Sequence, residues 1–196
     1  MPQVKCPYSC SWWPRVARCW RSGGAGAFEM GVRRDLLIGI GNPLRGDDGV
    51  GPALLEALAA ELGGWRTASA ELHTVHQLTP ELALAVIGVQ RVLFLDACMA
   101  SRSAEPWIER LQLPENPAAS SWLLGGHQWA PLSLLALAQS LYGWRGEGAL
   151  LRVPAFAFPH GTSFSTPLLQ ALPKAKELMD GWLRGDDRDR LADACG

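Results

Sequence analysis

Long apolar runs, a secretory leader and blocks of like charge are all missing from this 196-residue sequence. No apolar stretch reaches the length needed to cross a bilayer, and the N-terminus lacks the basic, apolar and small-residue order of a secretory signal. We therefore expect a cytoplasmic protein. The net charge is -1, with acids and bases spread along the chain, which provides no electrostatic footprint for nucleic acid or an anionic membrane. We expect neither as a partner.

Cysteines are few and unevenly placed. Three of the five, Cys6, Cys10 and Cys19, lie in the first nineteen residues, which is not the distribution of a disulfide framework. A metal site built from these three would lack a fourth ligand at finger-like spacing. Residues 1–34 also show no strand or helix periodicity, and we interpret them as a disordered or mis-annotated N-terminal extension. We expect one α/β domain over residues 35–184 and a flexible tail at 185–196.

From Asp35 onward, apolar strand-like runs alternate with helical patterns. The strand candidates are 36–41, 70–75, 91–97, 106–113 and 148–156, and prolines around the fourth favour an edge position. The helix candidates are 49–62, 79–88 with Thr79 as N-cap, 130–143, and 166–183. This order predicts an α/β fold with three helix-sheet-helix layers and a twisted, mostly parallel sheet of about five strands.

The stretch GIGNPLRGDDGVG, residues 39–51, resembles a dinucleotide-binding turn only in part. Leu44 stands where the third glycine would be, and two carboxylates at the start of the helix would repel a phosphate, so we reject phosphate binding. The glycines instead predict a sharp turn or a close backbone approach. Asp47 is interpreted as a helix N-cap, which leaves Asp48 as a candidate cation ligand.

Two further candidate ligands follow predicted strands or precede a helix. Asp96 ends the strand RVLFLDA, and His127 lies in a glycine-containing loop before a helix. Ligand sites in such folds lie beyond the carboxyl ends of the strands, so Asp48, Asp96 and His127 would converge there. Two carboxylates and one imidazole suit a borderline divalent transition metal and leave coordination positions open, and zinc is chemically allowed. Cys98 is interpreted as an inert thiol, and His73, His76 and His160 as non-ligands, His76 being the least certain.

Three segments together resemble the nickel-iron hydrogenase maturation peptidases. They are GIGNPLRGDDGVG, VLFLDA and GGHQWAPLSLL, in that order, and the resemblance extends over roughly residues 35–183. It implies that Asp48, Asp96 and His127 bind nickel and form the catalytic site. It also implies an endopeptidase that removes the C-terminal extension of a hydrogenase large-subunit precursor after nickel insertion. The nickel cofactor would be carried by the precursor and recognised there rather than stored by the enzyme.

Two other functions stay open at this point. The same three residues would serve a docking or chaperone module that binds the nickel-loaded precursor without cutting it. A nucleotide-binding domain is the third hypothesis. For the peptidase we expect a metal-activated water as the attacking group, because no serine or cysteine nucleophile with a base partner is evident. A monomer suffices for a single cut.

Overall fold

The computed structural model describes residues 35–65, 69–99, 105–113 and 129–186. The chain divides into two compact units, Met1–Gly31 and Val32–Gly196, and all the described residues belong to the second. The proposed extension at 1–34 and most of the proposed tail therefore lie outside the described residues.

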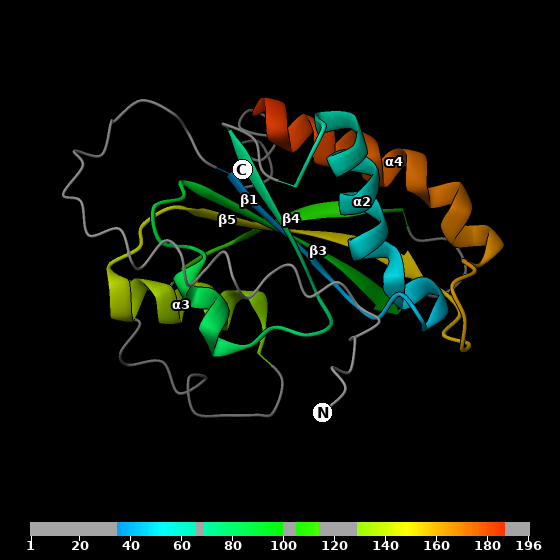
Figure 1. Cartoon of the computed structure of the whole chain (residues 1–196), viewed down its shortest axis with the longest axis horizontal. Coiled ribbons are helices and arrows are strands. Elements are labelled where there is room, and N and C mark those ends of the chain that lie inside the picture. Colours follow the sequence, from blue (N-terminus) through cyan, green and yellow to red (C-terminus); the bar gives the residue numbers. More distant parts are fainter. Residues whose placement is uncertain (1–34, 66–68, 100–104, 114–128, 187–196) are drawn as a thin grey trace, which may run out of the picture. The chain divides into compact units, whose positions relative to one another are not determined.

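A five-stranded sheet forms the centre of this unit (Figure 1). Its strands are β1 (Asp35–Ile40), β2 (Ala70–Val75), β3 (Arg91–Met99), β4 (Trp107–Leu111) and β5 (Glu147–Ala155), in the spatial order β2-β1-β3-β5-β4. The first, second, third and fifth are parallel, whereas β4 pairs with β5 in the antiparallel direction at the edge. The predicted fold class and the edge position of the fourth strand are confirmed.

Helices cover both faces of the sheet. On one face, α2 (Val50–Leu62) and α4 (Thr166–Arg184) pack over alternate strand residues that include Leu37, Leu95 and Leu151. On the other face, α3 (Pro131–Tyr142) and the short 3-10 helix η2 (Pro80–Leu84) pack over Leu36, Phe94 and other residues of opposite parity. This alternation follows from the two-residue period of a strand and produces the three predicted layers. Figure 1 shows α2 and α4 together on one side and α3 on the other.

One predicted helix is much shorter than expected. Residues 79–88 were predicted to form a helix capped by Thr79, but only the 3-10 helix η2 forms there, and the Thr79 side chain makes no capping bond to it. Leu78, Ala83 and Val86 are buried against the sheet. Residues 85–89 continue in separate three-residue turns, such as the bond from the N–H of Val89 to the carbonyl oxygen of Val86, and this irregular path buries the apolar side chains without a regular α-helix.

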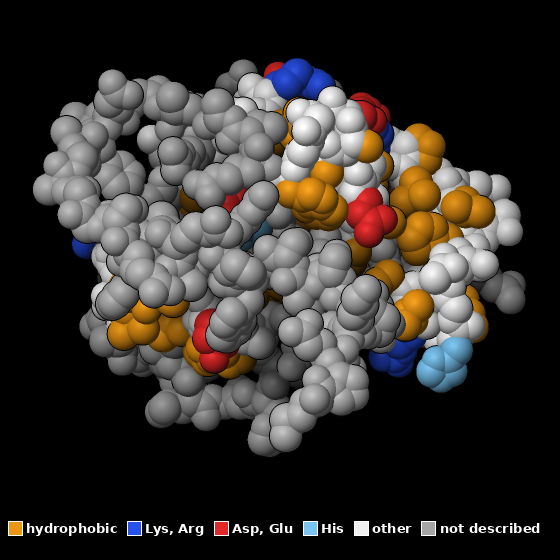
Figure 2. Space-filling model, in the orientation of Figure 1, with side chains coloured by type: hydrophobic (Ala, Val, Ile, Leu, Met, Phe, Trp, Pro, Cys, Tyr) orange, Lys and Arg blue, Asp and Glu red, His pale blue; other side chains and the backbone are white. Residues whose placement is uncertain are grey.

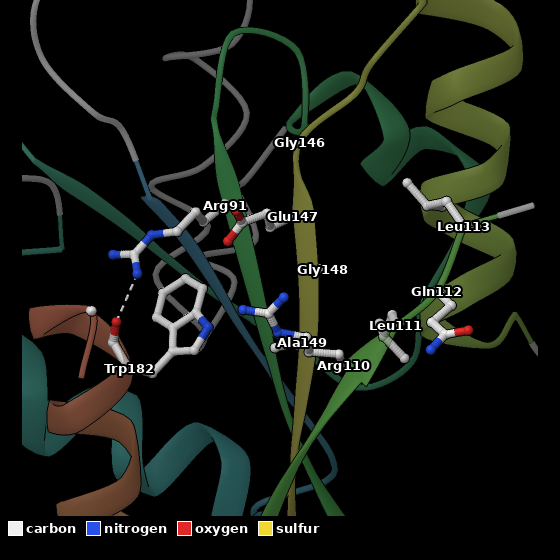
Figure 3. Close-up of a pocket in the computed structure, with 11 residues that line it drawn as sticks. Arg91, Arg110, Leu111, Gln112, Leu113, Gly146, Glu147, Gly148, Ala149 and Trp182 are labelled. Carbon is white, nitrogen blue, oxygen red and sulfur yellow. Dashed lines mark hydrogen bonds between the residues drawn. The ribbon is translucent and has the colours of Figure 1, made fainter. Parts of the chain in front are cut away.

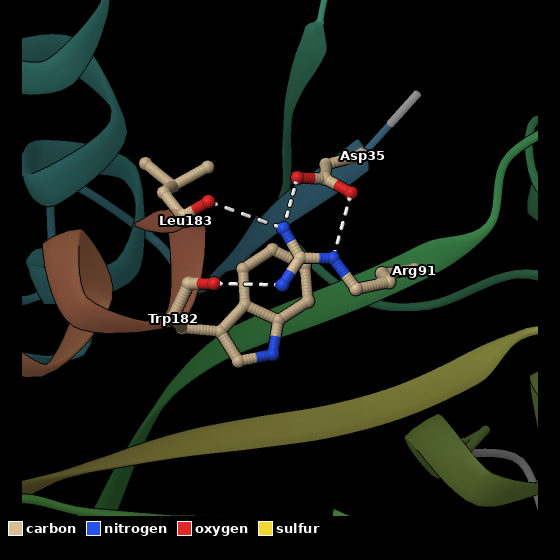
Figure 4. A network of polar contacts seen from close by, with 4 residues as sticks. All are labelled: Asp35, Arg91, Trp182 and Leu183. Carbon is tan, nitrogen blue, oxygen red and sulfur yellow. Dashed lines mark hydrogen bonds and ion pairs between the residues drawn. The ribbon is translucent and has the colours of Figure 1, made fainter. Parts of the chain in front are cut away.

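A buried ion pair ties the beginning of the sheet to the end of α4 (Figure 4). Arg91 donates to both carboxylate oxygens of Asp35, and also to the carbonyl oxygens of Trp182 at 2.8 Å and Leu183 at 3.2 Å. Its guanidinium lies 4.3 Å from the centre of the Trp182 ring. All three nitrogens of this buried guanidinium thus donate to an acceptor, as a charge away from water requires.

The surface seen in Figure 2 carries hydrophobic side chains over the side where Figure 1 places α2 and α4. Leu62 and Leu169 are about half exposed on these helices. Scattered apolar residues of this kind are normal on a soluble surface. Within the described ranges, no helix combines the length and the apolar character needed to span a membrane.

Candidate functional site

The loop after β1 folds back on itself and places Asp48 at the end of the strand. A carboxylate oxygen of Asp48 accepts a hydrogen bond from the backbone N–H of Asn42 at 2.9 Å, and the side chain of Asn42 accepts one from the N–H of Leu44. Gly41 has a φ of 134°, and a Cβ there would lie 1.8 Å from the carbonyl oxygen of Asp48. Glycine is required at this position both by the backbone angle and by the lack of space.

The start of α2 lies directly against the end of β1 and the middle of β3. A Cβ on Gly51 would come within 2.5 Å of the carbonyl oxygen of Leu95 and 2.7 Å of that of Ile40. A Cβ on Gly39 would lie 2.6 Å from the carbonyl oxygen of Gly51. The expectation that these glycines permit a sharp turn and a close backbone approach is confirmed. The contact brings the loop that carries Asp48 next to β3, which carries Asp96.

Asp47 does not cap its own helix, so that interpretation was wrong. Neither η1 (Gly46–Gly49) nor α2 receives a capping bond from a side chain. The fully buried carboxylate of Asp47 instead accepts hydrogen bonds from the backbone N–H groups of Phe156, Ala157 and Ser165, and from the hydroxyl of Ser165, at 2.7–3.0 Å.

These bonds make Asp47 the anchor of the segment between β5 and α4. Burial alone would raise the pKa of Asp47, but the hydrogen bonds from Ser165, Phe156 and Ala157 outweigh it and lower the pKa. The hydroxyl of Ser165 also accepts a bond from the N–H of Leu168 and so caps α4. The two adjacent aspartates therefore differ in their contacts. Asp47 binds the segment between β5 and α4, whereas Asp48 lies at the end of β1 and accepts a bond from Asn42.

Asp96 lies at the carboxyl-end part of β3, on the same face of the sheet as Phe94. Its pKa is raised to about 6, chiefly by burial, with the negative charge of Asp48 adding to the effect. The positive charge of Arg152 and a hydrogen bond from the N–H of Ala97 act in the opposite direction. The effect of the Asp48 charge on Asp96 indicates that the two predicted carboxylates are near enough to interact electrostatically. A divalent cation between them would favour the ionised form of both.

Arg152 and Glu109 were not predicted as part of this region. Arg152 on β5 is the register partner of Asp96 on β3, and its Nε donates to Glu109 of β4 at 3.0 Å. Cys98 lies two residues beyond Asp96, and burial raises the pKa of its thiol, with Asp96 and Glu109 adding to the rise against Arg152. This agrees with an unreactive thiol. The signal for Arg152 in the sequence was a single charge within the apolar run GALLRVPAF.

His127, the third predicted ligand, lies outside the described residues. It stands four residues before Pro131, the first residue of α3. Among the described residues, no group of three or more histidine, cysteine or acidic side chains is arranged to hold a metal ion. His73 lies 2.9 Å from a carboxylate oxygen of Glu71, while His76 and His160 are exposed. Their assignment as non-ligands stays a prediction.

A hollow lies at the opposite end of the strands (Figure 3). It has a volume of about 320 Å³ and is lined by Arg91, Arg110, Glu147 and Trp182, among others. Arg91 and Glu147 are register partners at the starts of β3 and β5, whereas Asp96 and Arg152 are partners farther along the same strands. Since open α/β sheets bind ligands at the carboxyl ends of their strands, this hollow is not the candidate site.

Comparison with solved structures identifies this fold. The NiFe hydrogenase maturation protease HybD from Thermococcus kodakarensis matches with a TM-score of 0.56 and 22% identity, covering 76% of this chain and 99% of that chain. The endopeptidase HybD from E. coli has a TM-score of 0.55 and 20% identity, covering 78% and 93%. HycI from Thermococcus kodakarensis KOD1 has a TM-score of 0.57 and 19% identity, covering 79% and 95%.

These matches show that the described unit has the fold of the solved hydrogenase maturation proteases. No family model matches the sequence, and no curated protein matches it.

Proposed function

We propose that this protein is an endopeptidase that removes the C-terminal extension of a nickel-iron hydrogenase large-subunit precursor once nickel has been inserted. The observation that carries the proposal is a fold shared with solved maturation proteases in which the close approach of Gly51 to β1 and β3 brings the loop of Asp48 beside the strand of Asp96, near enough for the two charges to interact. The ordered resemblance of three sequence segments to the same family supports it independently.

The chemistry of the donor groups fits a nickel ion that arrives with the substrate. Asp48 and Asp96 supply carboxylate oxygens, and His127 supplies an imidazole nitrogen in this proposal. Such a set suits borderline divalent metals and, with only three protein ligands, leaves room for ligands from the precursor. Burial and mutual repulsion disfavour two ionised carboxylates in the absence of a cation, so binding the metal would relieve an unfavourable charge arrangement.

The residues of the chain then act mainly by positioning. Asp48 is held by the N–H of Asn42, and its loop is fixed by Gly41 and by the four bonds of Asp47. A precursor docked through its metal would present one peptide bond at a fixed place beside the two carboxylates. Orientation of this kind accelerates a reaction by removing the entropy cost of bringing the groups together.

The test is an intact-mass measurement of the large-subunit precursor, with and without nickel, after incubation with the protein. We expect loss of a C-terminal peptide only from the nickel-loaded precursor. Asp48→Asn, Asp96→Asn and His127→Ala should reduce the cleavage to background. Glu177→Gln, which removes an exposed carboxylate on α4, is the matched control and should cleave normally.

Two outcomes would contradict the proposal. Binding of the nickel-loaded precursor by the wild type with no change in mass would instead identify a docking or chaperone module. Absence of both binding and cleavage would rule out the hydrogenase precursor as the partner.

A further inference from the structure

Arg152 is an unusual residue for its place in the sheet. It is the only charged residue between Gly148 and Ala155 of β5, and its neighbours Leu151 and Val153 are fully buried. Its own side chain is 35% exposed. A cation in the middle of an apolar strand is uncommon because its charge resists transfer out of water. This position therefore calls for an explanation beyond packing.

Its ion pair with Glu109 does not supply that explanation. The pair is a single contact of 3.0 Å through Nε, and the Glu109 side chain is 40% exposed. Ion pairs with this much exposure contribute little to stability. A guanidinium also carries five N–H donors, of which this contact uses one. The two terminal nitrogens of Arg152 donate to no acceptor among the described residues.

The placement of Arg152 connects it to the candidate site. In the parallel pairing of β3 and β5 it stands directly opposite Asp96, and paired residues on neighbouring strands project from the same face. On its other side it is the register partner of Trp107, the first residue of β4. The unused donors thus belong to a side chain one strand away from Asp96, at the edge where the substrate would dock.

We propose that Arg152 is a substrate-binding residue, whose terminal nitrogens donate to a backbone carbonyl oxygen of the precursor segment that lies beside the docked metal. This inference rests on the proposed function and names a contact within it. The planar guanidinium fork provides two parallel donors with fixed directions, which a lysine ammonium does not provide. A peptide held at the metal and at this second point cannot rotate about the metal, so one peptide bond is selected.

The experiment compares the wild type, Arg152→Gln and Arg152→Lys with the nickel-loaded large-subunit precursor, measuring both its dissociation constant and the KM and kcat of cleavage. Loss of a hydrogen bond from a charged donor predicts a rise in KM and in the dissociation constant of roughly 10- to 100-fold in Arg152→Gln. The change in kcat should be smaller and should also occur in a variant that only removes the charge, because the positive charge of Arg152 lowers the pKa of Asp96. Arg152→Lys should not restore binding, because it keeps the charge and loses the fork. Arg110→Gln is the matched control, since it removes one exposed positive charge on β4 at the far edge, and it should leave KM unchanged.

The outcomes separate this inference from the proposed function. Normal KM and dissociation constant in Arg152→Gln, with an unchanged melting temperature, would overturn the inference and leave the peptidase intact. Full restoration by Arg152→Lys would also overturn it, because charge alone would then be sufficient. If the wild type binds the precursor without cutting it, the peptidase proposal fails, and the dissociation constants still decide the role of Arg152. No binding by the wild type would overturn both.

Discussion

Replacing Asp96 by asparagine should stabilise the metal-free protein, and the gain should depend on pH. The folded state raises the pKa of this carboxyl from 3.8 to about 6, so folding favours its protonated form. The sign follows directly. Below pH 3.8 the carboxyl is protonated and neutral in both the folded and the unfolded states, so its ionisation does not lower the free energy of unfolding. As the pH rises from 3.8 through about 6, the carboxyl ionises more readily in the unfolded state than in the folded state, where it is half-buried. The free energy of unfolding of the wild type therefore falls over this range.

The size of the effect follows from the same two values. At 1.36 kcal/mol for each pKa unit, the difference between 3.8 and about 6 corresponds to roughly 3 kcal/mol. Partial exposure of Asp96 to solvent makes this an upper bound, and we expect about 1 to 3 kcal/mol. Asparagine is neutral at every pH and keeps an oxygen that accepts the bond from the N–H of Ala97. Asp96→Asn should therefore unfold like the wild type near pH 4 and be more stable above pH 7.

Urea unfolding of the metal-free wild type and Asp96→Asn at several pH values between 4 and 8 measures this difference. The same comparison in a protein that carries Asp48→Asn tests whether the charge of Asp48 contributes to the effect. Because the charge of Asp48 contributes to the raised pKa, Asp96→Asn should gain less stability in a protein that already carries Asp48→Asn. A stability difference that stays constant over the whole pH range would refute the reasoning, as would a loss of stability in Asp96→Asn above pH 7.

Two further predictions concern the loop that carries Asp48. Asp47→Ala leaves three backbone N–H groups and one hydroxyl without their acceptor, so it should lower the free energy of unfolding by at least about 3 kcal/mol. Hydrogen exchange should show the amides of Phe156, Ala157 and Ser165 protected in the wild type and released in Asp47→Ala, and continued protection would contradict the anchoring role. Gly51→Ala should cost more than about 2 kcal/mol in chemical denaturation, because its Cβ would press on two strand carbonyls. Gly63→Ala is the control and should cost only about 1 kcal/mol, because a φ of 74° is strained for alanine but the added Cβ would have no neighbouring atom within 4 Å. Equal losses of stability in the two variants would contradict the close approach of Gly51 to the strands.

Local patterns predicted the order and type of the elements well. The central strands β1, β3 and β5 contain apolar runs, and the helices α2, α3 and α4 each begin or end at residues with a clear local signal, such as Pro131 or Gly143. The rule that ligand sites lie at the carboxyl ends of parallel strands led to the prediction that Asp48 and Asp96 lie at the same end of the sheet. Neither inference needed to know which strands are neighbours.

Features that depend on distant partners could not be predicted in this way. The carboxylate of Asp47 bonds to residues 109, 110 and 118 positions away, so its local context suggested a helix cap instead. Arg152 lies opposite Asp96 only through the register of β5 with β3, which the sequence does not display. The segment at 79–88 shows the opposite problem, because its apolar spacing fits a full helix although a 3-10 helix followed by irregular turns buries its side chains.

The strand order has a consequence for the biosynthesis of the protein. Asp48 and Asp96 come from the first half of the chain, but β3 acquires its second neighbour only when β5, the last strand in sequence, is inserted between β3 and β4. Until β5 has left the ribosome, the strand that carries Asp96 is an open edge, and Ser165 is not yet available to fix Asp47. The two carboxylates can therefore assume their final arrangement only after most of the chain, through Ser165, has been synthesised.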